Sequence, residues 1–229
     1  MIRLQVIYED NHLIAVNKPA GVLVQGDETG DIPMSDIVKK YIKDRYNKPG
    51  DVFLGVIHRI DRPVSGVVIF ARTSKALERM NQLFRDREIE KTYWAITSQR
   101  PEPLEGHLKH YILKDKTKNQ AKAYDRLSNR AKDAKEADLD YKMLAQIGSH
   151  VLLEVKPQTG RPHQIRVQLA TIGCPIRGDV KYGFPVGNDD GSICLHCRSL
   201  SFVHPVKKEP VTITADPPET MFWNYFSAF

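Results

Sequence analysis

The stretch that decides the fold lies at residues 56–72 and reads VIHRIDRPVSGVVIFAR. It sets one carboxylate, Asp61, between two arginines, Arg59 and Arg62. The positive charge of the two guanidinium groups favours the ionised form of the carboxylate. The stretch therefore predicts an anionic group in a basic neighbourhood.

The residues after Asp61 predict a turn over 63–66 and a buried strand over 67–70. A short apolar run bounded by turn residues is typical of such a strand. A group at the mouth of a rigid strand can be held still, as a catalytic side chain requires. The competing interpretation is a surface aspartate with salt-bridging arginines, a common and weakly stabilising cluster. The remainder of the chain decides between the two.

Length and composition are those of an ordinary globular protein. The chain has 229 residues, of which 41% are hydrophobic and 27% are charged, close to the average for such proteins. No apolar stretch approaches the roughly 18 to 20 residues that a transmembrane helix needs, and the N-terminus has no signal-peptide pattern. Three cysteines, an odd number, argue against a disulfide framework. We therefore expect a cytoplasmic protein without membrane segments.

Positive charge gathers in one segment, residues 107–135. The chain as a whole has a net charge of +6, which only weakly favours a polyanionic partner. The segment holds three aspartates and nine basic residues: Lys109, Lys114, Lys116, Lys118, Lys122, Arg126, Arg130, Lys132 and Lys135. Two interpretations stay open, a solvated loop face and a surface that contacts phosphates.

Hydrophobic periodicity predicts an α+β fold in a single domain over 1–229. Apolar residues recur at helical spacing over 33–46, 74–87 and 162–171. Alternation and short apolar runs predict strands over 5–17 (around a turn), 22–24, 91–97, 139–147, 151–156, 200–203 and 211–214. Many strands in antiparallel hairpins with few helices are typical of an α+β domain.

Six segments, taken in chain order, match the motifs of one known family. They read DNHLIAVNKPAG at 10–21, HRIDRPVSG at 58–66, KTYWA at 91–95, GRPHQIRVQLA at 160–170, GCPIRGDVKYG at 173–183 and LHCRSLSFVHP at 195–205. On these segments the chain resembles the RluA-type pseudouridine synthases. Three residues depart from the usual motifs, Val64, Pro162 and Gln168, and none of them carries the chemistry. We expect the chain to lack the small S4 RNA-binding domain of many relatives, because there is no room for it before residue 6.

The resemblance implies an isomerase that converts uridine in ribosomal or transfer RNA to pseudouridine. It implies a catalytic domain built on a mixed, mostly antiparallel β-sheet with flanking helices and an RNA-binding cleft. The reaction is an intramolecular transfer that needs no cofactor and no metal, and the sequence has no phosphate-binding or dinucleotide-binding glycine pattern. RNA is the expected partner. We expect a monomer with no obligatory protein partner.

The resemblance also implies the catalytic residues. Asp61 matches the catalytic carboxylate, which either attacks C1′ or removes a proton from C2′. Arg166 matches the basic residue that pairs with this aspartate, and Tyr93 matches the active-site tyrosine that stacks on the flipped uracil. Either role of Asp61 requires the anion, and the sequence leaves both open.

Four further residues are expected to bind the substrate. Arg59 matches a residue that enters the RNA stack in place of the flipped uridine. Ile165 is expected to form an apolar wall against the ring, and His58 and Arg161 complete the set.

Other functions compete with this interpretation. A non-catalytic RNA-binding protein on the same fold has no need of a buried carboxylate opposite RNA phosphates. A hydrolytic glycosidase normally uses two carboxylates, and only Asp61 is well placed. Cys194 and Cys197 invite a zinc interpretation, but structural zinc commonly uses two spaced ligand pairs and the second pair is missing.

Overall fold

The computed structural model describes residues 3–115, 117–129 and 131–229. Two of the basic residues named above, Lys116 and Arg130, therefore lie outside the described residues. The chain divides into two compact units. The first comprises Met1–Glu90 and Cys197–Pro218, and the second comprises Lys91–His196 and Glu219–Phe229.

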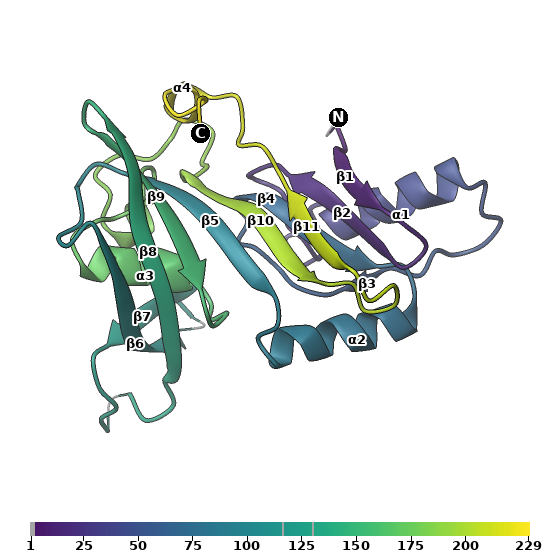
Figure 1. Ribbon diagram of the computed structural model, residues 1–229, viewed down its shortest axis with the longest axis horizontal. Helices are drawn as coiled ribbons and strands as arrows, with labels where there is room; N and C mark the ends of the chain where they lie inside the picture. Colours follow the sequence, from purple (N-terminus) through teal and green to yellow (C-terminus); the bar gives the residue numbers. More distant parts are fainter. Residues whose placement is uncertain (1–2, 116, 130) are drawn as a thin grey trace. The chain divides into compact units, whose positions relative to one another are not determined.

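The predicted helices and strands are largely present (Figure 1). The helices are α1 (Met34–Arg45), α2 (Ser74–Arg85), α3 (Gln164–Thr171), α4 (Met221–Asn224) and the 3₁₀ helix η1 (Val180–Tyr182). The strands are β1 (Val6–Glu9), β2 (Leu13–Lys18), β3 (Gly55–Val56), β4 (Ser65–Ala71), β5 (Glu90–Thr97), β6 (Glu105–Asp115), β7 (Gln120–Tyr124), β8 (Lys135–Ile147), β9 (His150–Pro157), β10 (Leu195–Val203) and β11 (Pro210–Thr214).

The first unit is built on strand β4. Its strands follow the order β1-β2-β4-β10, with β3 paired to β4 and β11 paired to β10. Every residue of β4 is buried, which confirms the buried strand predicted from the apolar run over 67–70. Strands β2 and β4 pair in antiparallel fashion from Leu13 opposite Ala71 to Lys18 opposite Gly66. The residues after Asp61 are thereby attached to the interior of the sheet.

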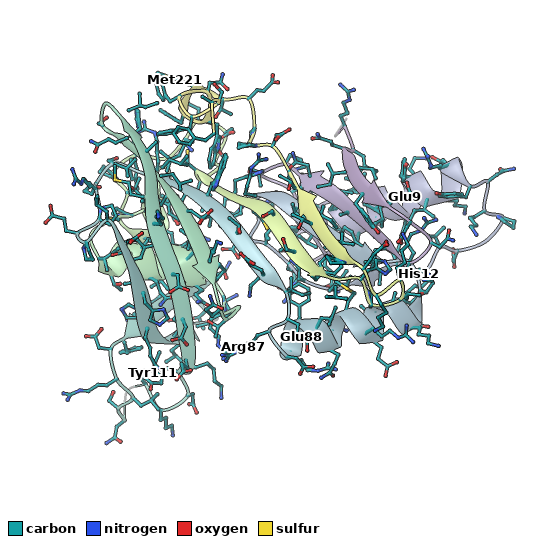
Figure 2. The ribbon with its side chains drawn as sticks, viewed as in Figure 1. Glu9, His12, Arg87, Glu88, Tyr111 and Met221 are labelled. Atoms are coloured by element: carbon teal, nitrogen blue, oxygen red, sulfur yellow. The ribbon has the colours of Figure 1, made fainter. Side chains whose placement is uncertain are left out.

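The turn between β1 and β2 is held by the side chain of Asp10. Its carboxylate accepts hydrogen bonds from the backbone amides of His12 and Leu13, each at 2.8 Å. Figure 2 labels Glu9 and His12, which flank this turn. The prediction of two strands around a turn is confirmed here.

The strand predicted at 22–24 is wrong. The Leu23 carbonyl accepts from the amide of Met34 at 2.7 Å, and the Val24 carbonyl accepts from the amide of Ser35 at 3.1 Å. The first amides of a helix have no partner inside the helix. The segment therefore satisfies the beginning of α1, and its apolar side chains fill the core without joining the sheet.

The second unit has its own antiparallel strands, in the order β5-β9-β8-β6-β7. The predicted hairpin of β8 and β9 is confirmed, with Gly148 in its turn at φ +57°. Helix α3 contacts β6 and β7. Alternation along these strands directs one set of small and apolar side chains into a shared core: Ile112, Ala121, Ala137 and, from α3, Val167.

Within the described part of the chain, no helix is both long and apolar enough to cross a membrane.

Candidate active site

Asp61 opens a tight turn at the start of β4. The amide of Val64 donates to the Asp61 carbonyl at 3.0 Å, which closes a four-residue turn. Ile60 and Val64 are 7% and 2% exposed and anchor the turn in the core. Asp61 itself is half-buried, and Arg59 is exposed. The carboxylate therefore sits on a fixed backbone and keeps access to solvent.

The turn lies two residues earlier than the sequence predicted. Ser65 and Gly66 were expected to belong to the turn, but they are the first residues of β4. A Cβ atom on Gly66 would lie 2.3 Å from the carbonyl oxygen of Cys197, and the glycine has φ +118°. Gly66 is required by this close approach of two backbones inside the sheet. The turn does not require a glycine at position 66, because Gly66 lies in β4.

Arg62 fastens the turn to the loop after β2. Its carbonyl accepts from the amide of Gly21 at 2.8 Å, and its Nε donates to the carbonyl of Gly21 at 2.9 Å. Its Nη2 lies 2.7 Å from the Asp31 carboxylate. The sequence assigned Arg62 no role beyond its charge, whereas the structure shows that it joins two loops.

Lys18 is the residue of this site that the sequence did not reveal. Its side chain is fully buried, and its Nζ donates to the carbonyls of Pro19, Val22 and Arg62 at 2.9, 2.8 and 3.3 Å. Burial lowers the pKa of Lys18 to about 7, and the negative charge of Asp61 opposes that change. The place of Lys18 in the NKPAG segment after an apolar run did not predict burial, because a lysine is almost never fully buried unless it is paired.

His58 packs against two elements of the first unit. Its Nε2 accepts from the amide of Ile69 at 3.1 Å, so the neutral ring satisfies a backbone donor of β4. The ring also stacks on Phe84 of α2, with 5.2 Å between centroids. These contacts fix the chain just before Asp61. The predicted contact of His58 with the substrate stays a prediction.

In the second unit, Arg161 holds the backbone that leads into α3. Its amide donates to the side-chain oxygen of Gln164 at 2.9 Å, and its Nε donates to the carbonyl of Glu136 at 2.8 Å. His163 follows in the left-handed region at φ +55°, an unusual conformation for a residue other than glycine. A contact of Arg161 with RNA stays a prediction.

Arg166 is buried on α3 and is bound by Asp179. Its Nε lies 2.7 Å from Oδ2 of Asp179, and its Nη2 lies 2.9 Å from Oδ1. The two residues are 5% and 1% exposed. The Arg166 guanidinium also lies 5.0 Å from the centroid of the Tyr182 ring. Asp179 and Tyr182 both come from the GDVKYG part of a family motif, but nothing in that pattern identified them as partners of Arg166.

Tyr93 and Ile165 also belong to the second unit. Tyr93 is half-buried on β5, opposite Val155 of β9, which confirms the predicted strand. Ile165 is 7% exposed at the beginning of α3. Their roles toward a uracil ring stay predictions.

The structure thus assembles two groups of site residues. In the first unit, Asp61 lies on a turn held by Lys18 and Arg62. In the second, Arg166 is held by Asp179. The pairing of Asp61 with Arg166 stays a prediction.

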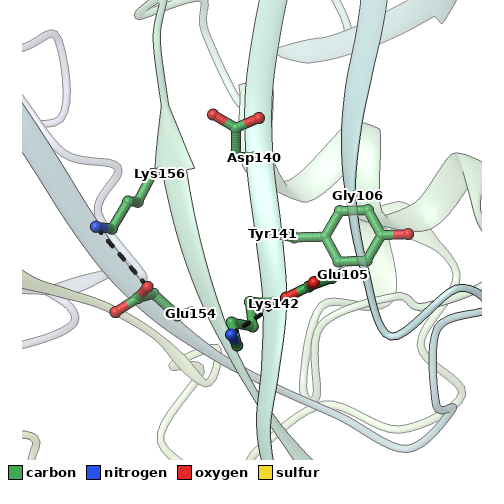
Figure 3. A pocket seen from close by; sticks show the side chains of 7 residues that line it. All are labelled: Glu105, Gly106, Asp140, Tyr141, Lys142, Glu154 and Lys156. Carbon is green, nitrogen blue, oxygen red and sulfur yellow. Dashed lines mark ion pairs between the residues drawn. The ribbon is translucent and has the colours of Figure 1, made fainter.

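A shallow hollow in the second unit holds none of the predicted site residues (Figure 3). It has a volume of about 300 Å³. Two ion pairs occupy it, Lys142–Glu105 between β8 and β6 at 3.2 Å and Lys156–Glu154 within β9 at 3.9 Å. Because its charges largely compensate each other, it is a solvated face of the sheet.

Metal-binding residues are not gathered anywhere in the described ranges, where no group of three or more His, Cys, Asp or Glu side chains could hold an ion. Cys194 and Cys197 are buried free thiols. The amide of Asn188 donates to the sulfur of Cys194 at 3.7 Å.

Comparisons with known proteins identify relatives along nearly the whole chain. Residues 12–171 match the family described as RNA pseudouridylate synthase. The chain is 34% identical over 237 residues to tRNA pseudouridine synthase C of Vibrio parahaemolyticus serotype O3:K6, covering 96% of this chain and 92% of that one. It is 30% identical to ribosomal large subunit pseudouridine synthase D of Xanthomonas campestris pv. campestris, covering 96% and 68%.

A solved structure confirms the predicted fold class. The human RNA pseudouridylate synthase domain containing 4 superimposes with a TM-score of 0.77 at 26% identity, covering 95% of this chain and 90% of that one. The fold is therefore the α+β pseudouridine synthase fold, with a mixed sheet and few helices.

Proposed function

The chain belongs to the RluA-type pseudouridine synthase family of RNA-modifying isomerases, and we propose that it modifies a uridine of transfer RNA, with Asp61 as the catalytic carboxylate. The reaction breaks the C1′–N1 bond of a uridine, turns the uracil and joins its C5 to C1′. All heavy atoms of the product come from the same nucleotide. The hydrogen at C5 leaves as a proton, and N1 takes up a proton. The observation that carries the proposal is the fixed turn of Asp61, which lies inside the family signature.

Asp61 acts as an anion in this proposal. It either attacks C1′ or removes the proton at C2′, and both steps need the ionised carboxylate. When Lys18 is protonated, Asp61 and Lys18 attract each other. A carboxylate held on a rigid turn also loses little freedom when the substrate arrives.

Arg166 and Tyr93 complete the proposed chemistry. Arg166 aims and stabilises the Asp61 carboxylate, and Tyr93 stacks on the extruded uracil and assists proton movement at C5. Ile165 forms an apolar wall beside the ring. Its burial next to Arg166 on α3 is in keeping with that role.

Arg59 is proposed to take the place of the extruded base. Its side chain is exposed and two positions from Asp61, and a guanidinium can stack on bases and bind phosphates. His58 and Arg161 are proposed to bind the RNA substrate as well.

Transfer RNA is the proposed substrate because of the similar relatives. The 34% identical Vibrio protein is named for transfer RNA and has nearly the same length. The 30% identical Xanthomonas protein is named for the ribosomal large subunit and is longer. Ribosomal RNA is the second candidate.

The proposal further describes a monomeric, cytoplasmic enzyme whose catalytic domain spans 1–229 and needs no protein partner. Purified protein alone should then convert RNA, and it should sediment as a single chain of 26.1 kDa. A dimer, or activity only after addition of cell extract, would contradict this part.

The deciding experiment uses RNA that carries tritium at C5 of its uridines. Isomerisation releases the tritium, a glycosidase would release free uracil, and an RNA-binding protein would release neither. Asp61→Ala should abolish release, and the exposed Asp51→Ala should not. Full tritium release by Asp61→Ala would show that Asp61 is not the catalytic carboxylate.

The substrate is identified by mapping pseudouridine in cells with and without the gene. A transfer RNA position that loses pseudouridine supports the proposal. Loss confined to ribosomal RNA would favour the second candidate.

A further inference from the structure

The hairpin of β6 and β7 is attached to the 3₁₀ helix η1. Nζ of Lys181 donates to the carbonyl of Asn119 at 3.0 Å, and the Gln120 amide donates to the carbonyl of Lys181 at 2.9 Å. The backbone amide of Ala121 donates to the hydroxyl of Tyr182 at 2.8 Å. These contacts join residues about 60 positions apart, all within the second unit.

The hydroxyl of Tyr182 is held from two sides. It accepts the hydrogen bond from Ala121, and it lies 2.7 Å from Nδ1 of His163. Because a backbone amide can only donate, the hydroxyl proton is free to point at Nδ1, which then acts as the acceptor. The left-handed conformation of His163, at φ +55°, places its ring there.

The ring of Tyr182 in turn borders Arg166. The guanidinium carbon lies 5.0 Å from the ring centroid, within the range of a cation–π contact. The amide of Tyr182 donates to the carbonyl of Asp179 at 3.1 Å, and Asp179 binds Arg166 through both oxygens. Tyr182 therefore restrains both the face of the guanidinium and the residue that binds its edge.

We propose that Tyr182 is a positioning residue for Arg166, and that the β6–β7 hairpin holds Tyr182 in place. The inference rests on the role of Arg166 in the proposed function. The exposed Lys118 and Lys122 of the basic segment 107–135 flank the three residues that are attached to η1. The hairpin stabilises the orientation of the guanidinium through Tyr182.

The test compares Tyr182→Phe with Tyr141→Phe. Tyr182→Phe keeps the ring but removes the hydrogen bonds that join the hydroxyl to Ala121 and His163. Tyr141 is the matched control, because its hydroxyl also makes a hydrogen bond inside the second unit, but to the carbonyl of Pro103, at 3.1 Å. The measurements are the single-turnover rate of tritium release and the dissociation constant for RNA.

Tyr182→Phe should slow tritium release roughly tenfold, because a small displacement of a catalytic group is costly. Its dissociation constant for RNA should stay within about twofold, since no phosphate contact is removed. Tyr141→Phe should change neither quantity. A rate equal to that of the wild type in Tyr182→Phe would overturn the inference.

A second pair of variants addresses the partner of the hydroxyl. His163→Asn retains an acceptor and tolerates the left-handed conformation, whereas His163→Gly tolerates the conformation without an acceptor. We expect near-normal release from the Asn variant and slow release from the Gly variant. Equal rates for the two would contradict the inference, even if Tyr182→Phe failed to fold.

A nuclear magnetic resonance measurement separates this inference from the proposed function. The Nε–H signal of Arg166, assigned by its loss in Arg166→Lys, should shift or broaden in Tyr182→Phe and remain in Tyr141→Phe. The signal is informative even if the wild type releases no tritium, a result that would refute the proposed function alone. An unchanged signal in Tyr182→Phe would refute the inference alone.

Discussion

Arg166 and Asp179 form a buried ion pair with two points of contact, at 2.7 and 2.9 Å. Two parallel bonds fix the plane of a guanidinium as well as its position. Buried pairs of this kind often add little net stability compared with an apolar pair, but removing one partner leaves an uncompensated charge. The contribution of Asp179 is therefore to fix the orientation of the Arg166 guanidinium.

Replacement of Asp179 by Asn should both destabilise the protein and slow the reaction. The uncompensated guanidinium should lower the free energy of unfolding by about 3 kcal/mol, measured by urea denaturation. The exposed pair Arg198–Asp216, at 2.8 Å, supplies the control. Asp216→Asn should cost less than about 1 kcal/mol, and an equal cost for the two variants would contradict the prediction.

Lys18 predicts a pH dependence of stability. Burial lowers its pKa in the folded protein to about 7, below the ordinary value of 10.5 that applies to the unfolded chain. Between these values the unfolded state holds a proton that the folded state has released, so the free energy of unfolding rises with pH. Below pH 7 both states are protonated, and the penalty of burying the charge is fully present.

The comparison of wild type with Lys18→Met isolates this effect. The experiment covers about pH 7.5 to 10. In this range the unfolding free energy of the wild type should rise relative to that of Lys18→Met, by up to about 1.4 kcal/mol per pH unit. The exposed Lys40→Met should run parallel to the wild type. If the unfolding free energy of Lys18→Met followed the same pH dependence as that of the wild type, the buried lysine would not titrate in this range.

Gly66→Ala should destabilise the first unit strongly. The new Cβ would lie 2.3 Å from the Cys197 carbonyl oxygen, and the other near atoms are also backbone, so the sheet itself would have to move. We expect a loss of about 3 kcal/mol or more. Gly30 also has a positive φ but nothing within 4 Å of a Cβ, so Gly30→Ala should cost only about 1 kcal/mol. Thermal or urea unfolding distinguishes the two outcomes.

Variants of Tyr93 separate its ring from its hydroxyl. Tyr93→Phe should bind RNA normally and release tritium about 100-fold more slowly, as expected for loss of a proton-transfer group. Tyr93→Leu should also weaken RNA binding, since stacking of one base on an aromatic ring contributes about 1–3 kcal/mol. Equal binding by the Phe and Leu variants would argue against stacking.

Much of the secondary structure could be predicted from local patterns. Helices α1, α2 and α3 lie within 33–46, 74–87 and 162–171, because apolar spacing and caps depend on neighbours a few positions away. Thr73, directly before α2, caps this helix by accepting from the amide of Ala76 at 3.1 Å. The predictions failed where the reason was distant in the chain. Residues 22–24 are apolar but satisfy the beginning of α1.

The amino-acid sequence by itself determined the family, the fold class and the position of Asp61, because six ordered motifs and the hydrophobic pattern are local properties of the chain. Only the tertiary structure decided what surrounds those residues. The burial of Lys18, the partner of Arg166 and the contact that requires Gly66 all join residues distant in sequence. Their charge and geometry depend on which backbone atoms the folded chain brings close, and such contacts have no local signature.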